Sequence, residues 1–153
     1  MHALRRFFAP TAVLLVVLPS AQALAAVQTA DCKVKKAAFA ASNELAEITS
    51  KTYVNAGAAP FHQRGKSAAC IIVRFDTQTI QNSTMQVRAL LDGSIMFPGE
   101  TSFTQNDGFV SSSHGFSWEG VAAPGSHTVQ IQVLSSDGSV MYIVSYFLSV
   151  QHL

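Results

Sequence analysis

The sequence predicts an all-β protein, a two-sheet antiparallel β-sandwich with an N-terminal arm, and two observations lead to this fold class. In several runs the apolar residues fall at every second position, as they do when strand side chains point alternately to the two faces of a sheet. Between the runs stand the turn dipeptides Asp92-Gly93, Pro98-Gly99, Asp107-Gly108, Pro124-Gly125 and Asp137-Gly138. Glycine supplies the turn dihedrals, and one apolar face beside one polar face is typical of two sheets packed face to face.

Residues 1–25 are predicted to be a secretory signal peptide. Arg5 and Arg6 precede an apolar stretch over residues 11–18, and the following small residues offer cleavage after Ala23 or, as we favour, after Ala25. The apolar stretch is shorter than the roughly 20 residues that a membrane-spanning helix needs. An uncleaved N-terminal anchor is the alternative. We therefore expect an exported protein, periplasmic or extracellular, without a membrane span once the signal is removed.

The remaining chain is predicted to be a linker or arm over residues 26–35 and one β-sandwich domain over residues 36–153. About 128 residues suffice for one domain with a proper core but not for two. The chain has ten Lys and Arg and nine Asp and Glu residues, so loss of Arg5 and Arg6 leaves eight against nine, a net charge of −1. This balance gives no electrostatic reason to expect nucleic acid or an anionic membrane as a partner.

Cys32 and Cys70 are predicted to form a disulfide bond. An even pair of cysteines in an exported chain is far more often bonded than free. Because Cys70 begins an apolar run, the bond would tie the N-terminal arm to the sheet. A redox role is disfavoured because the chain has no Cys-x-x-Cys motif.

The first elements are the least defined. Residues 36–48 (KAAFAASNELAEI) fit an amphipathic helix and a first strand equally well, because alanine alone can produce the helical spacing. Residues 48–54 are predicted to form a strand that ends at Asn55-Ala56-Gly57. A weak strand is expected near Phe61, before a polar loop around residues 64–66.

The later strands have clearer alternation. They are expected over residues 70–76, 84–92, 114–121, 126–134 and 140–150. In the last strand Met141, Ile143 and Phe147 fall on the face opposite Tyr142 and Tyr146. Because both faces of this strand are apolar, we expect it to be central or covered on both sides.

Three segments together resemble a known group of proteins. The runs MQVRALLDG (85–93), GFSWEGVAAPGSHTVQIQV (115–133) and FLSV (147–150) resemble a family of uncharacterised, mostly bacterial exported or phage-associated β-sandwich domains, over roughly residues 45–150. The resemblance implies a jelly roll of the kind seen in tumour-necrosis-factor-like and C1q-like domains, which often form trimers and bind partners. It implies no activity. The hairpin at residues 135–140 lacks the Gly-Thr pair of the common pattern, so an Ig-like topology stays open beside the favoured jelly roll.

Aromatic residues are the candidate ligand contacts. Phe116 and Trp118 lie two residues apart and therefore share one face of their strand. Aromatic side chains on an exposed face stack on sugars, whereas buried ones join the two sheets, which is the reading we favour for this pair. Phe103 and Phe109 are expected in loops as surface contacts. The candidate set is Trp118, Phe116, Phe103 and Phe109.

No motif points to catalysis, a metal or a cofactor. Of His62, His114, His127 and His152, no two lie within four residues of each other, so the paired histidines of common metal sites are missing. Serine and histidine lie side by side in the run Ser111–His114, but adjacent residues of this kind are not a triad, and a solvated loop explains the serines. A hydrolase in which Glu100, Asp107 and Glu119 converge is the enzymatic alternative.

The sequence thus predicts an exported binding or assembly module without catalytic activity. Its expected ligand is a glycan or a protein surface, and the family resemblance implies a homo-oligomer, specifically a trimer. The alternatives are the carboxylate-based hydrolase and a small outer-membrane β-barrel. Several predicted strands are shorter than the roughly ten residues that barrel strands need, and the chain ends in Leu153 where such barrels often have an aromatic residue.

Overall fold

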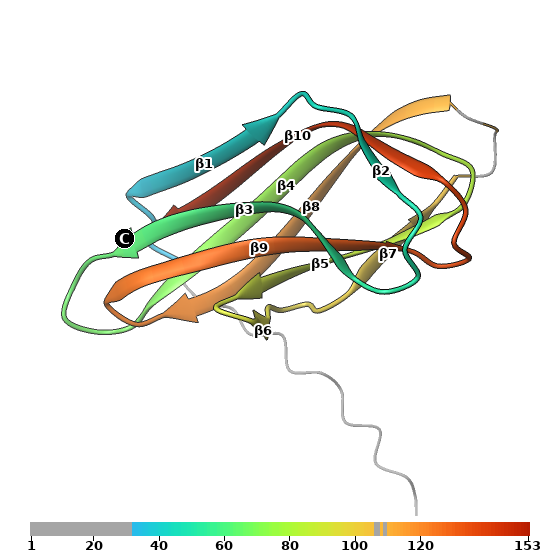
Figure 1. Cartoon of the computed structure of the whole chain (residues 1–153). Coiled ribbons are helices and arrows are strands. Elements are labelled where there is room, and N and C mark those ends of the chain that lie inside the picture. Colours follow the sequence, from blue (N-terminus) through green and yellow to red (C-terminus); the bar gives the residue numbers. More distant parts are fainter. Residues whose placement is uncertain (1–31, 106–107, 109) are drawn as a thin grey trace, which may run out of the picture.

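The computed structural model describes residues 32–105, 108 and 110–153. In this part of the chain ten strands form two antiparallel sheets that face each other (Figure 1). The predicted signal peptide, residues 26–31 of the predicted arm, and the candidate residues Asp107 and Phe109 lie outside the described residues.

Sheet A is built around the C-terminal strand. Its order is β1 (Lys36–Ser42), β10 (Met141–His152), β4 (Ala69–Gln81) and β8 (Val110–Ala122), and β2 (Ala46–Ile48) pairs with β10 beyond the end of β1. Sheet B has the order β3 (Val54–Gln63), β9 (Gly125–Ser135) and β5 (Thr84–Leu91), followed by β6 (Ser94–Ile95) and β7 (Thr101–Thr104), which both pair with β5.

The strand order is that of a jelly roll. When β1 with β2 and β6 with β7 are each taken as one position, the two sheets have four positions each. Every connection then crosses from one sheet to the other, except the one from β5 to β6. Eight strands wound in this way form the two Greek keys of a jelly roll, whereas Ig-like domains keep several hairpins within one sheet. The predicted sandwich is confirmed, and the jelly-roll topology holds over the Ig-like one.

Alternating residues from both sheets fill the space between them. The fully buried side chains include Ile71, Val73 and Phe75 on β4, Val129, Ile131 and Val133 on β9, and Trp118 on β8. On one side the sandwich is closed by a bridge between Phe97 and Glu119, whose backbone N–H groups donate to each other's carbonyl oxygens over 3.2 and 2.8 Å. The indole N–H of Trp118 donates to the Gly99 carbonyl at 2.9 Å, which fixes the same connection from within.

The predicted disulfide is confirmed. Cys32 is bonded to Cys70, with a Cα–Cα distance of 5.3 Å. The N–H of Lys35 donates to the carbonyl of His152 at the end of β10. The arm therefore passes from edge strand β1 across the end of β10 to reach β4.

Two segments differ from the prediction. Residues 36–48 form strands β1 and β2, so the helical alternative is wrong. Residues 49–53 contain no strand, and β3 instead begins at Val54 and runs through Asn55–Gly57, where a β-bulge shifts its register against β9. The Asn-Ala-Gly sequence is thus used for a bulge within a strand and not for a turn.

The serine-rich run before His114 was also misread. Residues 111–114 belong to β8 and pair with residues 77–80 of β4. Ser111 and Ser113 are exposed, whereas Ser112 and His114 are partly buried, so burial alternates along this part of the strand as it does elsewhere. Because none of these side chains is apolar, hydrophobic periodicity could not identify this part of β8 as a strand.

Candidate functional site

The outer face of sheet A exposes an aromatic pair. Phe39 on β1 is 63% exposed and Phe147 on β10 is 44% exposed. Their ring centroids lie 5.4 Å apart with an interplanar angle of 32°. Large apolar side chains on a sheet face are ordinarily buried, so an exposed pair in contact needs an explanation beyond packing.

A β-bulge in β10 places Phe147 on this face. The register against β4 shifts between Ile143 and Ser145. Before the bulge the odd-numbered residues Met141 and Ile143 are buried, whereas after it the even-numbered Leu148 and Val150 are. One extra residue therefore turns Phe147 from the core side to the solvent side. The prediction that β10 is a central strand is right, but its second face is not covered at Phe147.

A hollow of about 630 Å³ lies beside the aromatic pair. Its wall contains residues of all four long strands of sheet A, so it crosses the sheet from one edge to the other. The outward side chains that line it are those of Ala41, Asp76, Gln78, Ser113, Ser145 and Phe147, with Asn43 at the end of β1. A carboxylate, two amides and two hydroxyl groups thus border one aromatic ring.

Gly115 provides the floor of this hollow. Residues Ala41, Phe147, Asp76 and Gly115 form one row across the four strands. A Cβ atom on Gly115 would lie 2.9 Å from Oδ1 of Asp76, so the carboxylate leans into the space that the glycine leaves. The nearby amide of Gln78 donates to the hydroxyl of Ser111 at 2.8 Å, which holds that side chain flat along the face.

The charges on this face are not paired. Arg74 and Asp76 both lie on the outward side of β4 and are exposed. Within the described part of the chain, the ion pairs join Arg88 to Glu100 and His127 to Asp92, and neither includes Arg74 or Asp76. Both groups are therefore free to bind a ligand.

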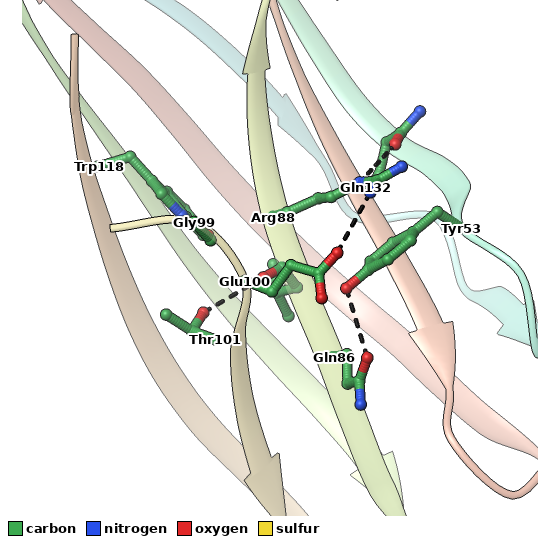
Figure 2. A network of polar contacts seen from close by, with 9 residues as sticks. Tyr53, Gln86, Arg88, Gly99, Glu100, Thr101, Trp118 and Gln132 are labelled. Atoms are coloured by element: carbon green, nitrogen blue, oxygen red, sulfur yellow. Dashed lines mark hydrogen bonds and ion pairs between the residues drawn. The ribbon is translucent and has the colours of Figure 1, made fainter. Parts of the chain in front are cut away.

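The outer face of sheet B is different, because its polar groups bind one another (Figure 2). The guanidinium of Arg88 lies 3.7 Å from the centre of the Tyr53 ring, donates to Oε1 of Gln132 at 2.9 Å and pairs with Glu100 at 3.2 Å. Burial, followed by the negative charge of Glu100, raises the pKa of Tyr53. The network fixes the chain before β3 against β5 and β9, and it occupies the face that a ligand would need.

A second, smaller hollow of about 330 Å³ lies beside the disulfide. Its lining is mainly apolar and includes the exposed side chains of Ile95, Phe97 and Val121. Glu119 is its single charged residue. This hollow offers a ligand fewer polar partners than the hollow on sheet A.

Of the aromatic residues that the sequence offered as ligand contacts, those that the structure describes do not lie at the hollow on sheet A. Trp118 is fully buried, so it is a core residue and offers no surface to a ligand. Phe116 and Phe103 are partly buried and pack against the core, with ring centroids 5.7 Å apart. Phe103 also lies in strand β7 and not in a loop. Phe109 lies outside the described residues.

The pair at the outer face of sheet A was not in the predicted set. Phe39 has two alanines on each side in the run KAAFAAS, and the alternation of burial in β1 makes it the large outward side chain of that strand. Its exposure could have been read from the sequence if residues 36–42 had been assigned as a strand. Phe147 gave no such signal, because the bulge that exposes it is not visible in the spacing of apolar residues.

Glu100 and Glu119, two of the three residues of the alternative hydrolase, do not come together. The Glu100 side chain pairs with Arg88 on the outer face of sheet B, whereas Glu119 points outward from β8 of sheet A. The two carboxylates thus face away from each other. The third, Asp107, lies outside the described residues.

His114 and His127 make hydrogen bonds to groups near them. Ser112 Oγ lies 2.7 Å from Nε2 of His114, and burial lowers the pKa of this histidine. His127 bridges two turns, with Nδ1 at 2.6 Å from Asp92 and Nε2 at 2.7 Å from the Ala123 carbonyl. Among residues 32–105, 108 and 110–153, no three His, Cys, Asp or Glu side chains gather as ligands for a metal ion. The same ranges contain no helix with the length and apolar character that a membrane span requires.

Comparisons with known proteins give structural likenesses only. No protein-family model matches the chain, and no curated protein matches it. The C-terminal domain of EclA, a sugar-binding protein, has a TM-score of 0.48 and 11% identity, covering 85% of this chain and 86% of that one. A family 35 carbohydrate binding module from Clostridium thermocellum has a TM-score of 0.41 and 14% identity, covering 75% and 92%. CBM36, a carbohydrate-binding module in complex with calcium and xylotriose, has a TM-score of 0.38 and 20% identity, covering 76% and 92%. These scores are too low to carry an argument about function.

Proposed function

We propose that this protein is an exported glycan-binding module that holds its ligand on the outer face of sheet A. The observation that carries the proposal is the exposed Phe39–Phe147 pair beside a hollow lined by a carboxylate, amides and hydroxyl groups. The chemistry of this surface suits a sugar. Aromatic rings present a flat apolar face, on which the C–H face of a pyranose stacks.

The polar groups around the rings match the edge of a sugar ring. Hydroxyl groups both donate and accept hydrogen bonds, so they pair with the acceptor oxygens of Asp76 and with the amide of Gln78. A carboxylate makes the stronger, charge-assisted bonds. Gly115 lets the ligand approach the backbone closely, since a side chain there would meet Asp76. Ligand sites commonly join an apolar surface to a few placed polar groups in this way.

A sugar fits this face better than a protein surface does. The core of a protein interface is largely apolar and poor in charged groups. Here the two phenylalanine rings stand next to the unpaired charges of Arg74 and Asp76 and a row of serines. Export belongs to the proposal and is supported by the Cys32–Cys70 disulfide, because such bonds persist in oxidising compartments.

The test is affinity electrophoresis against a panel of soluble neutral and acidic polysaccharides, followed by calorimetry with the best ligand. Phe147→Ala and Asp76→Ala are each expected to weaken binding about tenfold, which corresponds to about 1.4 kcal/mol. Phe97→Ala is the matched control, since Phe97 is also an exposed phenylalanine but lies beside the other hollow. Binding that is lost in the control and kept in the two site variants would overturn the assignment of the face. Failure of every polysaccharide to bind would overturn the function.

Three further features stay predictions. The absence of catalytic activity, the cleavage of the signal and the trimer implied by the sequence resemblance each require their own measurement. For the trimer, light scattering on the purified protein is sufficient, and the geometry of strand β1 leads to a different expectation.

A further inference from the structure

Among the residues that the structure describes, strand β1 has no neighbour on its outer side, so one edge of sheet A is open. It is hydrogen-bonded to β10 on one side, and Figure 1 shows it at the rim of the sandwich. An open strand edge presents unpaired backbone N–H and C=O groups to any other strand, and proteins usually protect such edges. The protections are proline, bulges, charged side chains, short strands or covering segments.

Within the described part of the chain the other sheet edges have such protections and β1 has none. Edge strand β3 contains Pro60 and a bulge at Asn55–Gly57. On the far side of sheet A, the Phe97 segment bridges to Glu119 of β8. The edge strands of sheet B beyond β5 are very short. In contrast, β1 is seven residues long, has an even register with β10, and reads KAAFAAS, with a charge only at its first residue.

We propose that two copies of this protein associate through β1, antiparallel and centred on Phe39, to give one continuous sheet across the dimer. Phe39 is the middle residue of the strand. A two-fold axis at this residue therefore pairs all seven residues of one copy with the seven of the other. Alanines then face alanines on both sides of the central Phe39 pair, and the side chains stand roughly perpendicular to the sheet, away from the edge along which the strands approach. The inference concerns assembly and does not depend on the proposed glycan ligand.

The charges around the strand favour this antiparallel partner. Lys35 and Lys36 precede or begin β1, whereas Glu44 and Glu47 follow it. All four side chains are exposed, and none takes part in an ion pair within the described residues. In the antiparallel dimer Lys36 lies opposite Ser42 of the second copy and Lys35 opposite Asn43, next to Glu44. The basic end of each copy thus meets the acidic end of the other, whereas a parallel arrangement would bring like charges together.

The dimer would also extend the outer face of sheet A. The hollow already reaches β1 at Ala41 and crosses β10, β4 and β8. With β1 paired to its copy, two such faces become one surface, and the two Phe39 rings lie at its centre. At a strand spacing of about 4.8 Å, the four positions of one sheet A span roughly 14 Å, and the eight positions of the joined sheet span roughly 34 Å.

The decisive experiment uses two charge variants of the protein secreted from the full-length chain. The acidic variant carries Lys35→Glu and Lys36→Glu, and the basic variant carries Glu44→Lys and Glu47→Lys. Light scattering over a concentration series should give a mass approaching twice the monomer for the wild type and a monomer for each variant alone. An equimolar mixture of the variants should form a one-to-one dimer, because opposite charges then meet at both ends. Misfolding cannot produce this rescue.

Cross-linking locates the contact. Phe39→Cys should form a disulfide-linked dimer under mild oxidation, because facing residues of an antiparallel pair have Cα atoms about 4.5–5.5 Å apart, within the range of a disulfide. Ala41→Cys is the matched control on the same strand and face, since its two copies would lie roughly 13 Å apart. A wild type that stays monomeric or forms trimers, variants that dimerise alone, or equal cross-linking of both cysteine variants would each overturn the proposal.

Discussion

Removal of the Cys32–Cys70 disulfide should destabilise the domain by an amount that the structure allows us to work out. The bond closes a loop with a sequence separation of 38 residues. The chain-entropy relation gives about 4 kcal/mol for a loop of this length at 25 °C, which is an upper value because denatured chains keep some compactness. A domain of about 120 residues unfolds with an entropy near 0.25 kcal/mol/K, so the melting temperature should fall by about 10–15 °C.

The assay is calorimetric unfolding of three samples: oxidised wild type, reduced wild type, and the Cys32→Ser/Cys70→Ser variant. Reduced wild type and the variant should melt together, well below the oxidised protein, because both lack the same restriction on the unfolded chain. The variant should not respond to reductant. If oxidised and reduced wild type melt within about 2 °C of each other, the loop argument fails. If the variant melts far below reduced wild type, lost packing around the half-buried Cys70 is the larger effect.

Two further predictions concern close contacts and pH. A Cβ atom on Gly57 would lie 3.0 Å from the ring of Tyr146, so Gly57→Ala should cost about 1–3 kcal/mol of unfolding free energy in denaturant titration. The cost should largely vanish in a Tyr146→Ala background, and an equal cost in both would contradict the contact. The hydrogen bond to Asp92, and then that to the Ala123 carbonyl, raise the pKa of His127, while the same Asp92 contact lowers the pKa of that carboxyl. The contribution of His127 to the free energy of unfolding is therefore full below about pH 6.5 and is lost as the pH rises through the raised pKa of the folded state. The contribution of Asp92 is present above about pH 4 and is lost as the pH falls through the lowered pKa of the folded state. Because Asp92 is half exposed, the effect of the His127–Asp92 pair should be modest. We expect His127→Gln to lower the melting temperature by about 4 °C near pH 5.5 and by less near pH 8.5. A difference that does not depend on pH would contradict the role of this ion pair.

Strand alternation predicted the parts of the fold in which both period and register are regular. The strands that contain Val73, Val87 and Ile131 lie where the spacing placed them, and all three side chains are buried. The disulfide was predicted from the cysteine count together with the predicted export. The order of the strands did not follow from periodicity, because alternation assigns faces within a strand and says nothing of its neighbours. The jelly-roll expectation came from the sequence resemblance alone.

The candidate site on sheet A was not predicted, again because the sequence pattern does not show how the strands pair. A bulge changes the face of every residue that follows it, and its position depends on pairing with another strand. Phe147 therefore looked like a partner of Ile143 in the sequence, although the bulge separates their faces. Phe39 was hidden by the alanines around it, which satisfy a helix and a strand equally. For Trp118 the favoured core role is confirmed, since its indole is fully enclosed and donates to Gly99.

The two outer faces of the sandwich differ in what a ligand would have to displace. On sheet B, Arg88 already contacts Tyr53, Gln132 and Glu100, so a ligand gains a hydrogen bond there only by breaking one. On sheet A, Arg74 and Asp76 have no ion-pair partner in the described chain, and an apolar ring stands beside them. A bound sugar or second chain would add contacts on this face without an internal cost of that kind. Three features lie in this one sheet: the bulge in β10, Gly115 on β8 and the unpaired edge of β1. Recognition and assembly are therefore both expected at sheet A, while the sheet B network stabilises the domain.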